Sequence, residues 1–209
     1  MVDAVNREAF SVLNNVKDYL GIKDTFFVSS NIPSLGSYNN FIVHELHKYI
    51  KTDYALIIQV DGYPVNKDAW TDDFLKYDYI GAPWYLQPWE LDKTVGNGGF
   101  SLRSRKFLAA SARLDYSGFE EPEDVFLCRS SDKILKQNGI KFAPHDLAYK
   151  FSVEDMPYKG QFGFHGKHTI RLNKAIKIFR WFILLIDNVI FQRSLLARNA
   201  QKEKKKKNV

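Results

Sequence analysis

The chain of 209 residues is long enough for one domain with its own hydrophobic core, or for one domain with an appendage. Its composition is 45% hydrophobic, 26% charged and 15% aromatic, which excludes a disordered, collagen-like or disulfide-framework protein. The single cysteine, Cys128, excludes an internal disulfide and a C-x-x-C metal or redox site, and it indicates a reducing compartment.

The basic charge is concentrated in the C-terminal part of the chain. Residues 171–209 carry 11 Lys/Arg and 2 Asp/Glu, a net charge of +9. Because the whole chain carries +6, residues 1–170 carry −3. A duplex-binding domain would place its cations on the folded face that meets phosphate, so this distribution argues against nucleic acid as a partner.

No segment of the sequence has the pattern of a signal peptide or a membrane span. Residues 1–10 lack the basic and apolar regions of a signal peptide. The longest late apolar run, residues 181–186, has six residues, whereas a bilayer span needs about 20. We therefore expect a cytoplasmic protein.

The first part of the chain predicts helices alternating with strands. Apolar residues at helical spacing predict a helix over about 9–20, ended by Gly21. A short buried strand is expected over 25–29 and a second helix over 39–50. The run YALIIQV, Tyr54–Val60, is almost entirely apolar, which is typical of a central strand that is covered on both faces.

The same alternation continues after residue 70. The expected elements are a short helix over 72–77, a strand over 79–82, a strand over 100–102, a helix around 105–112, a helix over 123–138 and an edge strand over 140–143. Strands alternating with helices predict an α/β fold whose central sheet is mostly parallel and flanked by helices. In such a sheet, ligands bind beyond the carboxyl ends of the strands.

Asp61 is the first candidate for a functional residue. It directly follows the predicted central strand, and Gly62 after it allows a sharp turn. One interpretation is a turn aspartate that caps the next segment. The other is a ligand for a divalent ion that bridges the phosphates of a sugar nucleotide.

The segment FGFHGKH, residues 162–168, is the second candidate. His165 lies between two glycines, and Lys167 follows two residues later. The glycines permit a close approach of the backbone, the imidazole can bind a metal, and the ammonium group can contact a phosphate. The alternative is an ordinary surface histidine.

The acidic segment EEPED, residues 120–124, also has two interpretations. Acidic residues and Pro122 suit the first turn of a helix, where they stabilise the helix dipole. One of the carboxylates could instead serve as a general base or orient an acceptor hydroxyl.

Two further segments suggest contacts with a substrate. In the loop PWYLQPW, Trp84 and Trp89 either stack on the apolar faces of sugars or pack in the core. The segment GNGGFSLR lacks the spacing of a phosphate-binding loop and precedes a strand, so we interpret Gly98 and Gly99 as backbone shaped for close approach to a substrate.

Seven sequence blocks lie between Gln59 and Gly166, in the order QVDGYPVNKDAW, FLKYDYIGAPW, VGNGGFSLRSR, EPEDVFLC, GIKFAP, LAYKFSVED and FGFHG. Together, in this order, they resemble a family of small GT-A-like glycosyltransferases. Many members of that family are known only as a domain of unknown function, and a sugar transferase encoded by a large algal virus is similar.

The resemblance implies a GT-A-like nucleotide-sugar transferase that moves a hexose or deoxyhexose from a UDP-sugar to a glycan or another hydroxyl acceptor. It also implies a divalent cation, Mn²⁺ or Mg²⁺, as cofactor. The family's acidic metal ligand falls on Asp61 and the metal-binding histidine of related enzymes on His165. Lys167 resembles their phosphate-contacting lysine, and the pair Glu123–Asp124 resembles their acidic acceptor motif. Trp84 and Trp89 would line the acceptor side, with Gly98 and Gly99 close by.

The sequence departs from the family pattern in two places. Where the family usually has Asp-x-Asp, the segment Asp61-Gly62-Tyr63 offers one carboxylate, with Gly62 on the donor side. The first strand is reduced to residues 1–6, in which Asp3 is the only matched polar group of the donor site. Two other functions therefore stay open: a non-catalytic nucleotide- or sugar-binding module, and a phosphohydrolase acting on nucleotide sugars.

The C-terminal segment lies outside the resemblance, and we expect it to follow a catalytic domain of residues 1–168. Apolar and basic residues alternate from Ile170 to Leu196, and a lysine-rich run follows over 202–207. One interpretation is an amphipathic basic helix that contacts an anionic membrane surface, which would make the protein a peripheral membrane protein. The other is a helix packed on the domain, with a disordered basic tail.

Overall fold

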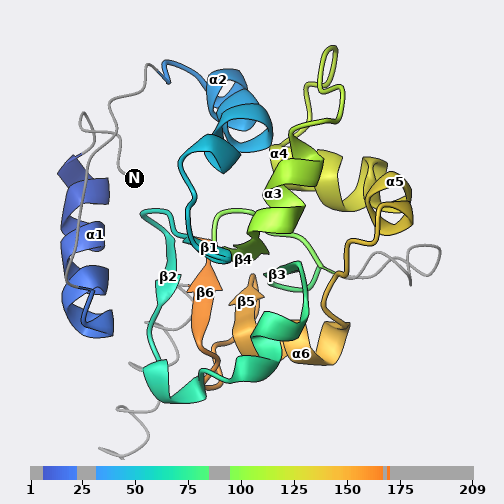
Figure 1. Cartoon of the computed structure of the whole chain (residues 1–209). Helices are drawn as coiled ribbons and strands as arrows, with labels where there is room; N and C mark the ends of the chain where they lie inside the picture. Colours follow the sequence, from blue (N-terminus) through green and yellow to red (C-terminus); the bar gives the residue numbers. More distant parts are fainter. Residues whose placement is uncertain (1–6, 23–31, 85–94, 167–168, 170–209) are drawn as a thin grey trace, which may run out of the picture. The chain divides into compact units, whose positions relative to one another are not determined.

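The computed structural model describes residues 7–22, 32–84, 95–166 and 169 (Figure 1). The chain divides into a first compact unit, Met1–Thr169, and a second unit, Ile170–Val209. The second unit, and with it the predicted amphipathic helix and basic tail, lies outside the described residues. Among the helices that are described, none is long and apolar enough to cross a membrane.

The two predicted N-terminal helices are present. Helix α1, Arg7–Leu20, ends at Gly21, whose φ of +70° is the left-handed conformation that glycine adopts readily. Helix α2, Leu35–Asn40, begins earlier than predicted because the Ser34 side chain accepts a hydrogen bond from the backbone N–H of Ser37, at 3.1 Å. It continues through a π turn, Phe41–Glu45, and a 3₁₀ turn, Leu46–Lys48.

The described strands form two small three-stranded sheets. Sheet A has the order β1-β4-β3 and consists of β1 (Tyr54–Ile57), β4 (Ser101–Ser104) and β3 (Tyr79–Gly81). Sheet B has the order β2-β6-β5 and consists of β2 (Gly62–Pro64), β6 (Gly163–His165) and β5 (Ser152–Glu154). The fold is therefore mixed α/β. Within these sheets, the pair β5–β6 is parallel and the other three pairs are antiparallel.

The prediction of a mostly parallel central sheet is thus wrong for the described strands. Strand β4 runs between β1 and β3 in the opposite direction to both, which makes two antiparallel pairs. The run beginning at Tyr54 was expected at the sheet centre, yet β1 lies at the edge of sheet A as described, and its residues are only half-buried. The central strand is β4, whose four residues are all buried.

The remaining helices follow the predicted order with two differences. The 3₁₀ turns Lys67–Ala69 and Asp72–Lys76 precede β3, and α3, Arg105–Ser111, follows β4. The helix predicted over 123–138 is interrupted, and consists of α4 (Glu123–Val125), a π turn (Phe126–Ser130) and α5 (Asp132–Gln137). The predicted edge strand over 140–143 contributes a single bridge, and α6, His145–Phe151, was not predicted. The strand predicted over 25–29 lies outside the described residues.

Helices lie on both sides of the strands. Figure 1 shows α2, α3, α4 and α5 on one side of the strands and α6 on the other, next to β5.

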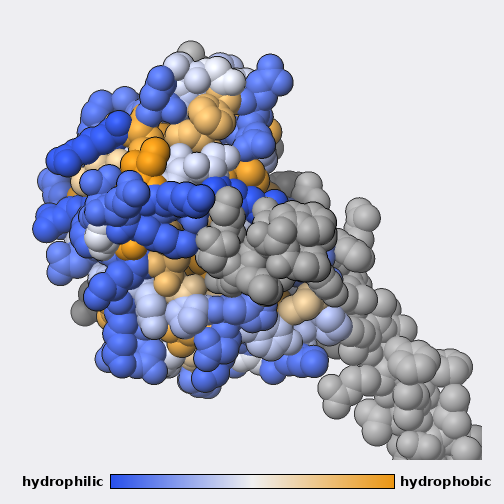
Figure 2. All heavy atoms as spheres, turned by 90° about the vertical axis from the view of Figure 1, so that its right-hand side faces the viewer, coloured by the Kyte–Doolittle hydropathy of each residue, from blue (hydrophilic) through white to orange (hydrophobic). Residues whose placement is uncertain are grey.

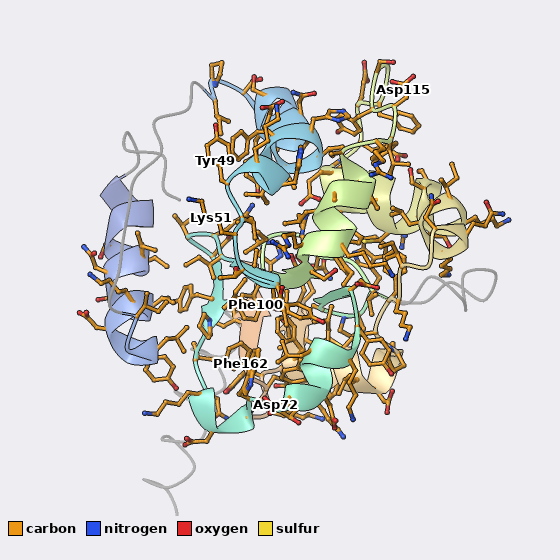
Figure 3. The ribbon with its side chains drawn as sticks, viewed as in Figure 1. Tyr49, Lys51, Asp72, Phe100, Asp115 and Phe162 are labelled. Carbon is orange, nitrogen blue, oxygen red and sulfur yellow. The ribbon has the colours of Figure 1, made fainter. Side chains whose placement is uncertain are left out.

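An aromatic cluster packs between the segments that carry the two sheets. Phe100, directly before β4, stacks on Phe151 of α6 with ring centroids 5.0 Å apart. Phe162, directly before β6, lies 5.9 Å from Phe100, and Figure 3 shows both rings in the interior. The strands that carry the candidate site are thus anchored on one buried cluster.

Polar side chains cover most of the surface drawn in Figure 2, with smaller apolar areas between them. The single cysteine of the chain, Cys128, is buried.

Candidate functional site

The two predicted metal ligands lie together where the chain passes from sheet A to sheet B. After β1 the chain reverses in a tight turn, in which the N–H of Gln59 donates to the carbonyl of Gly62 at 2.8 Å. This turn carries Asp61 and leads into β2, which pairs with β6 so that Gly62 lies opposite His165. Asp61 Oδ1 and His165 Nε2 are 3.9 Å apart. The pairing of β2 with β6 therefore joins two candidates that are distant in the sequence.

Glu154 fixes the orientation of the His165 ring. It lies opposite His165 on the parallel strand β5, and its Oε1 is 2.7 Å from His165 Nδ1. Burial lowers the pKa of His165, but the hydrogen bond and charge of Glu154, helped by the charges of Asp61 and Asp124, outweigh burial and raise that pKa above its ordinary value. The ring nitrogen on the other side, Nε2, is left facing Asp61 and Gln59.

Gln59 is a third polar group at this point, which the sequence reasoning missed. Its side-chain Oε1 is 3.4 Å from His165 Nε2, and its Nε2 donates to the hydroxyl of Tyr38 at 2.8 Å. Burial, with the charge of Glu123, raises the pKa of Tyr38 to about 12, so the phenol stays protonated at neutral pH. The spacing Gln-Val-Asp, which puts a polar group two residues before Asp61, was the available signal.

Gly62 and Gly99 leave room for the His165 ring. A Cβ atom on Gly99 would lie 2.1 Å from His165 Nε2 and 2.5 Å from Gln59 Oε1. A Cβ on Gly62 would lie 2.7 Å from His165 Cδ2. The close approach predicted for the glycine segment is made here by the protein's own side chains, which gives a structural reason for glycine at both positions.

Gly98 faces a second, closed cluster of charges. A Cβ on Gly98 would lie 2.1 Å from Glu123 Oε1. Both oxygens of Glu123 are bound by the guanidinium of Arg103, at 2.8 and 3.1 Å, and both residues are buried. Burial raises the pKa of Glu123, and the charge of Arg103 acts against this rise. Glu123, one of the two predicted catalytic residues, is therefore committed to an internal ion pair.

Asp124 binds the backbone of the glycine segment beside the closed cluster. Its Oδ2 accepts a hydrogen bond from the backbone N–H of Gly98 at 3.0 Å, and its Oδ1 accepts one from the N–H of Val125 at 3.0 Å. The residue is only partly buried, and its charge contributes to the raised pKa of His165. Of the predicted catalytic pair, Asp124 is thus the carboxylate that stays partly accessible.

Trp84 is held in a fixed orientation on the other side of the glycine segment. Its indole Nε1 donates to Asn97 Oδ1 at 3.2 Å, and the guanidinium carbon of Arg129 lies 4.2 Å from the ring centroid. Trp84 is half-buried, so part of its surface stays accessible. The other predicted site residues, Asp3, Trp89 and Lys167, lie outside the described residues.

The donor atoms at the junction fit part of a cation shell. In the described ranges, no group of three or more His, Cys, Asp or Glu residues could hold a metal ion. A carboxylate, an imidazole and an amide oxygen nevertheless suit Mn²⁺ or Mg²⁺, and Mg²⁺ sites typically complete their shell with water and substrate phosphates. The hydrogen bond from His165 Nδ1 to Glu154 is the support that metal-binding histidines have, with Nε2 left for the metal. These residues fit a cation that shares its shell with a bound phosphate.

Sequence comparison assigns the chain to a family. A model of the family described as "Protein of unknown function (DUF5672)" matches residues 21–165. No curated protein and no solved structure matches the chain. The matched region contains Gln59, Asp61, Asp124 and His165, and it covers more than half of the sequence. The chain belongs to the DUF5672 family.

Proposed function

We propose that the protein is a cation-dependent glycosyltransferase that moves a sugar from a UDP-sugar to a hydroxyl group of an acceptor. One observation carries the proposal: Asp61, in the turn before β2, and His165, on β6, converge together with Gln59, which is 106 residues from His165 in the chain. The seven sequence blocks that resemble small glycosyltransferases support the reaction class. They also support a GT-A-like arrangement of the mixed α/β fold.

A divalent cation at this site would stabilise the negative charge that develops on the departing nucleoside diphosphate. Asp61 would bind it through a carboxylate oxygen, His165 through Nε2 and Gln59 through its amide oxygen. Glu154 and Tyr38 would keep the last two donors aimed at the same point. Because Asp61 supplies the only negative charge among these three donors, we expect the cation to bind much more tightly with the diphosphate than alone.

The acceptor would be positioned by Asp124. Its carboxylate oxygens each accept one backbone N–H, so each keeps capacity for a further hydrogen bond. Asp124 would accept the hydrogen bond of the acceptor hydroxyl and take its proton. Glu123 would act only as a positioning residue, because Arg103 binds both of its oxygens and together they hold the glycine segment next to Asp124.

Product analysis tests the proposal. The full chain is incubated with a panel of UDP-sugars and Mn²⁺, with and without hydroxyl acceptors, and released UDP, free sugar and glycosylated acceptor are measured. We expect glycosylated acceptor to form only when Mn²⁺ is present. Free sugar released at the same rate without acceptor would point to a phosphohydrolase. UDP binding without any turnover would point to a non-catalytic binding module.

A further inference from the structure

A cleft of about 830 Å³ opens next to the candidate cation site. One wall is formed by Trp84 and Asn97, between the end of β3 and the glycine segment. The cleft is also lined by α6, with His145, Asp146, Tyr149 and Lys150, and by the end of β5. None of the site residues predicted from the sequence came from α6, because that helix was itself not predicted.

Glu154 connects this cleft to the cation site. Glu154 lines the cleft, and its carboxylate accepts the hydrogen bond of His165 Nδ1 at 2.7 Å. One side chain therefore separates a molecule in the cleft from the proposed cation ligand. A ligand bound here would lie beside the reacting groups of the proposed transferase.

Hydrogen bonds within the protein hold part of the cleft lining in place. The Asn97 side chain accepts from Trp84 Nε1 and donates to the carbonyl of Ala82 at 3.1 Å, which locks the indole in place. Asn97 and Asp155 have φ values of +58° and +53°, and they are the two non-glycine residues with positive φ in the described part of the chain. Both line this cleft. Asparagine and aspartate adopt this left-handed conformation more readily than other side-chain-bearing residues do, and here it sets the direction of the backbone at both positions.

The charges of the cleft decide which class of ligand it takes. The carboxylates that line the cleft are those of Asp146, Glu154 and Asp155, and the basic side chains are Lys150 and His145. Glu154 is already paired with His165, whereas no described cation forms an ion pair with Asp146. A diphosphate would be repelled by the Asp146 carboxylate, and an apolar ligand would take carboxylates out of water without giving them hydrogen bonds. A neutral molecule with many hydroxyl groups avoids both costs.

The available side chains match such a molecule. Asp146 and Tyr149 form no side-chain hydrogen bond with another described residue, so their polar atoms are free for ligand hydroxyls. The ring of Tyr149 offers a face on which the C–H side of a sugar ring stacks, whereas the Trp84 ring is already covered in part by Arg129. We propose that this cleft binds a neutral saccharide, which, on the function proposed above, is the acceptor.

The experiment is a backbone amide NMR titration of the full chain without nucleotide or cation. The probes are neutral trisaccharides of glucose, galactose, mannose and N-acetylglucosamine, with a trisaccharide of galacturonic acid as the anionic comparison. We expect at least one neutral trisaccharide to shift the amide signals of Asn97, Tyr149 and Asp155. The variants Asp146→Asn and Tyr149→Ala should raise its Kd about tenfold, whereas Asp68→Asn, an exposed aspartate outside the cleft, should leave it unchanged.

A separate titration of the same samples with UDP and Mg²⁺ keeps the two proposals apart. Its expected shifts are at Gln59, Asp61 and Gly99, and the cleft variants should not change them. UDP–Mg²⁺ shifts without any saccharide shift in the cleft would overturn the cleft proposal alone. Saccharide shifts without UDP–Mg²⁺ shifts would support the cleft proposal and overturn the transferase proposal. A preference for the galacturonic acid trisaccharide, or unchanged Kd in both cleft variants, would also contradict the cleft proposal.

Discussion

Two charged clusters lie against neighbouring glycines, and they differ in how much of their bonding capacity the protein uses. The cluster at Gly98 is closed, because the side chains of Arg103 and Glu123 are 0% and 4% exposed and bind each other through two hydrogen bonds. The cluster at Gly99 is open, since His165 and Asp61 are 17% and 21% exposed and lie 3.9 Å apart. The first cluster stabilises the fold, and the second keeps donor atoms available for a ligand.

Breaking the closed cluster should have the largest effect. Glu123→Gln leaves the Arg103 cation buried without its counter-charge, and we expect it to lower the free energy of unfolding by about 3–5 kcal/mol. Urea denaturation measures this. The double variant Arg103→Met/Glu123→Leu replaces the pair by apolar side chains and should recover most of the loss. A cost in Glu123→Gln no larger than that of a surface substitution would contradict the description of a sealed pair.

Removing the Asp61 carboxylate from the open cluster should lower the rate of sugar transfer and leave the free energy of unfolding almost unchanged. Asp61→Asn keeps the shape of the side chain and removes the charge that would hold the cation. If transfer is detected, we expect its turnover to fall about 100-fold or more, because a cation ligand contributes several kcal/mol to the barrier. The unfolding free energy should change by less than about 0.5 kcal/mol. Asp68→Asn is the matched control, and equal activity of the two variants would remove Asp61 from the cation site.

Filling the space beside His165 and Gln59 should have an intermediate effect on stability and on UDP binding. Gly99→Ala places a methyl group 2.1 Å from His165 Nε2, so the ring and Gln59 must move apart. We expect a loss of about 1–3 kcal/mol in stability and a weaker metal-dependent binding of UDP. Gly36→Ala is the control, because the nearest atom to a Cβ there is 3.9 Å away. Similar effects of the two substitutions in denaturation and UDP titration would show that the space at Gly99 is not needed.

The pH dependence of His165 should give the smallest effect. Because its pKa is raised in the folded protein, its contribution to stability is fully present below the pKa of the unfolded chain and is lost as the pH rises through the folded pKa. Glu154→Gln removes the main charge that raises this pKa and should lower the midpoint seen for the ring in NMR. A wild-type midpoint at or below the ordinary histidine value, or no change in the variant, would contradict the proposed role of Glu154.

Local elements of the fold could be predicted from the sequence, whereas their pairing could not. Apolar spacing and glycine positions predicted α1, α3 and β3 because those patterns depend on residues close together in the chain. The direction and place of β4 depend on partners far away, and Arg103 at its buried centre contradicts the apolar pattern expected of a central strand. The ion pair with Glu123, with further hydrogen bonds to Ser101 and to the carbonyl of Gly98, makes that arginine compatible with burial.

The candidate site shows the same division. Asp61 could be singled out because it follows an apolar strand, and His165 because glycines flank it. Gln59, Tyr38 and Glu154 gain their roles from contacts between distant segments. The spacing Gln-Val-Asp marks Gln59 locally, but no local pattern marks Tyr38 or Glu154. Glu123 and Asp124 could not be told apart from their positions in the chain, since the difference between them is the partner that each one binds.

The most direct test of the central claim is a thermal-shift titration of the full chain with UDP, with and without Mn²⁺, against GDP and ADP. A ligand that binds only the folded state raises Tm by mass action, so even modest affinity is detected. We expect UDP to raise Tm more than the other nucleotides do, only when Mn²⁺ is present, and not in Asp61→Asn. An absence of any rise with UDP and Mn²⁺, or an equal rise without Mn²⁺ and in the variant, would contradict a nucleotide-sugar site at the junction of the two sheets.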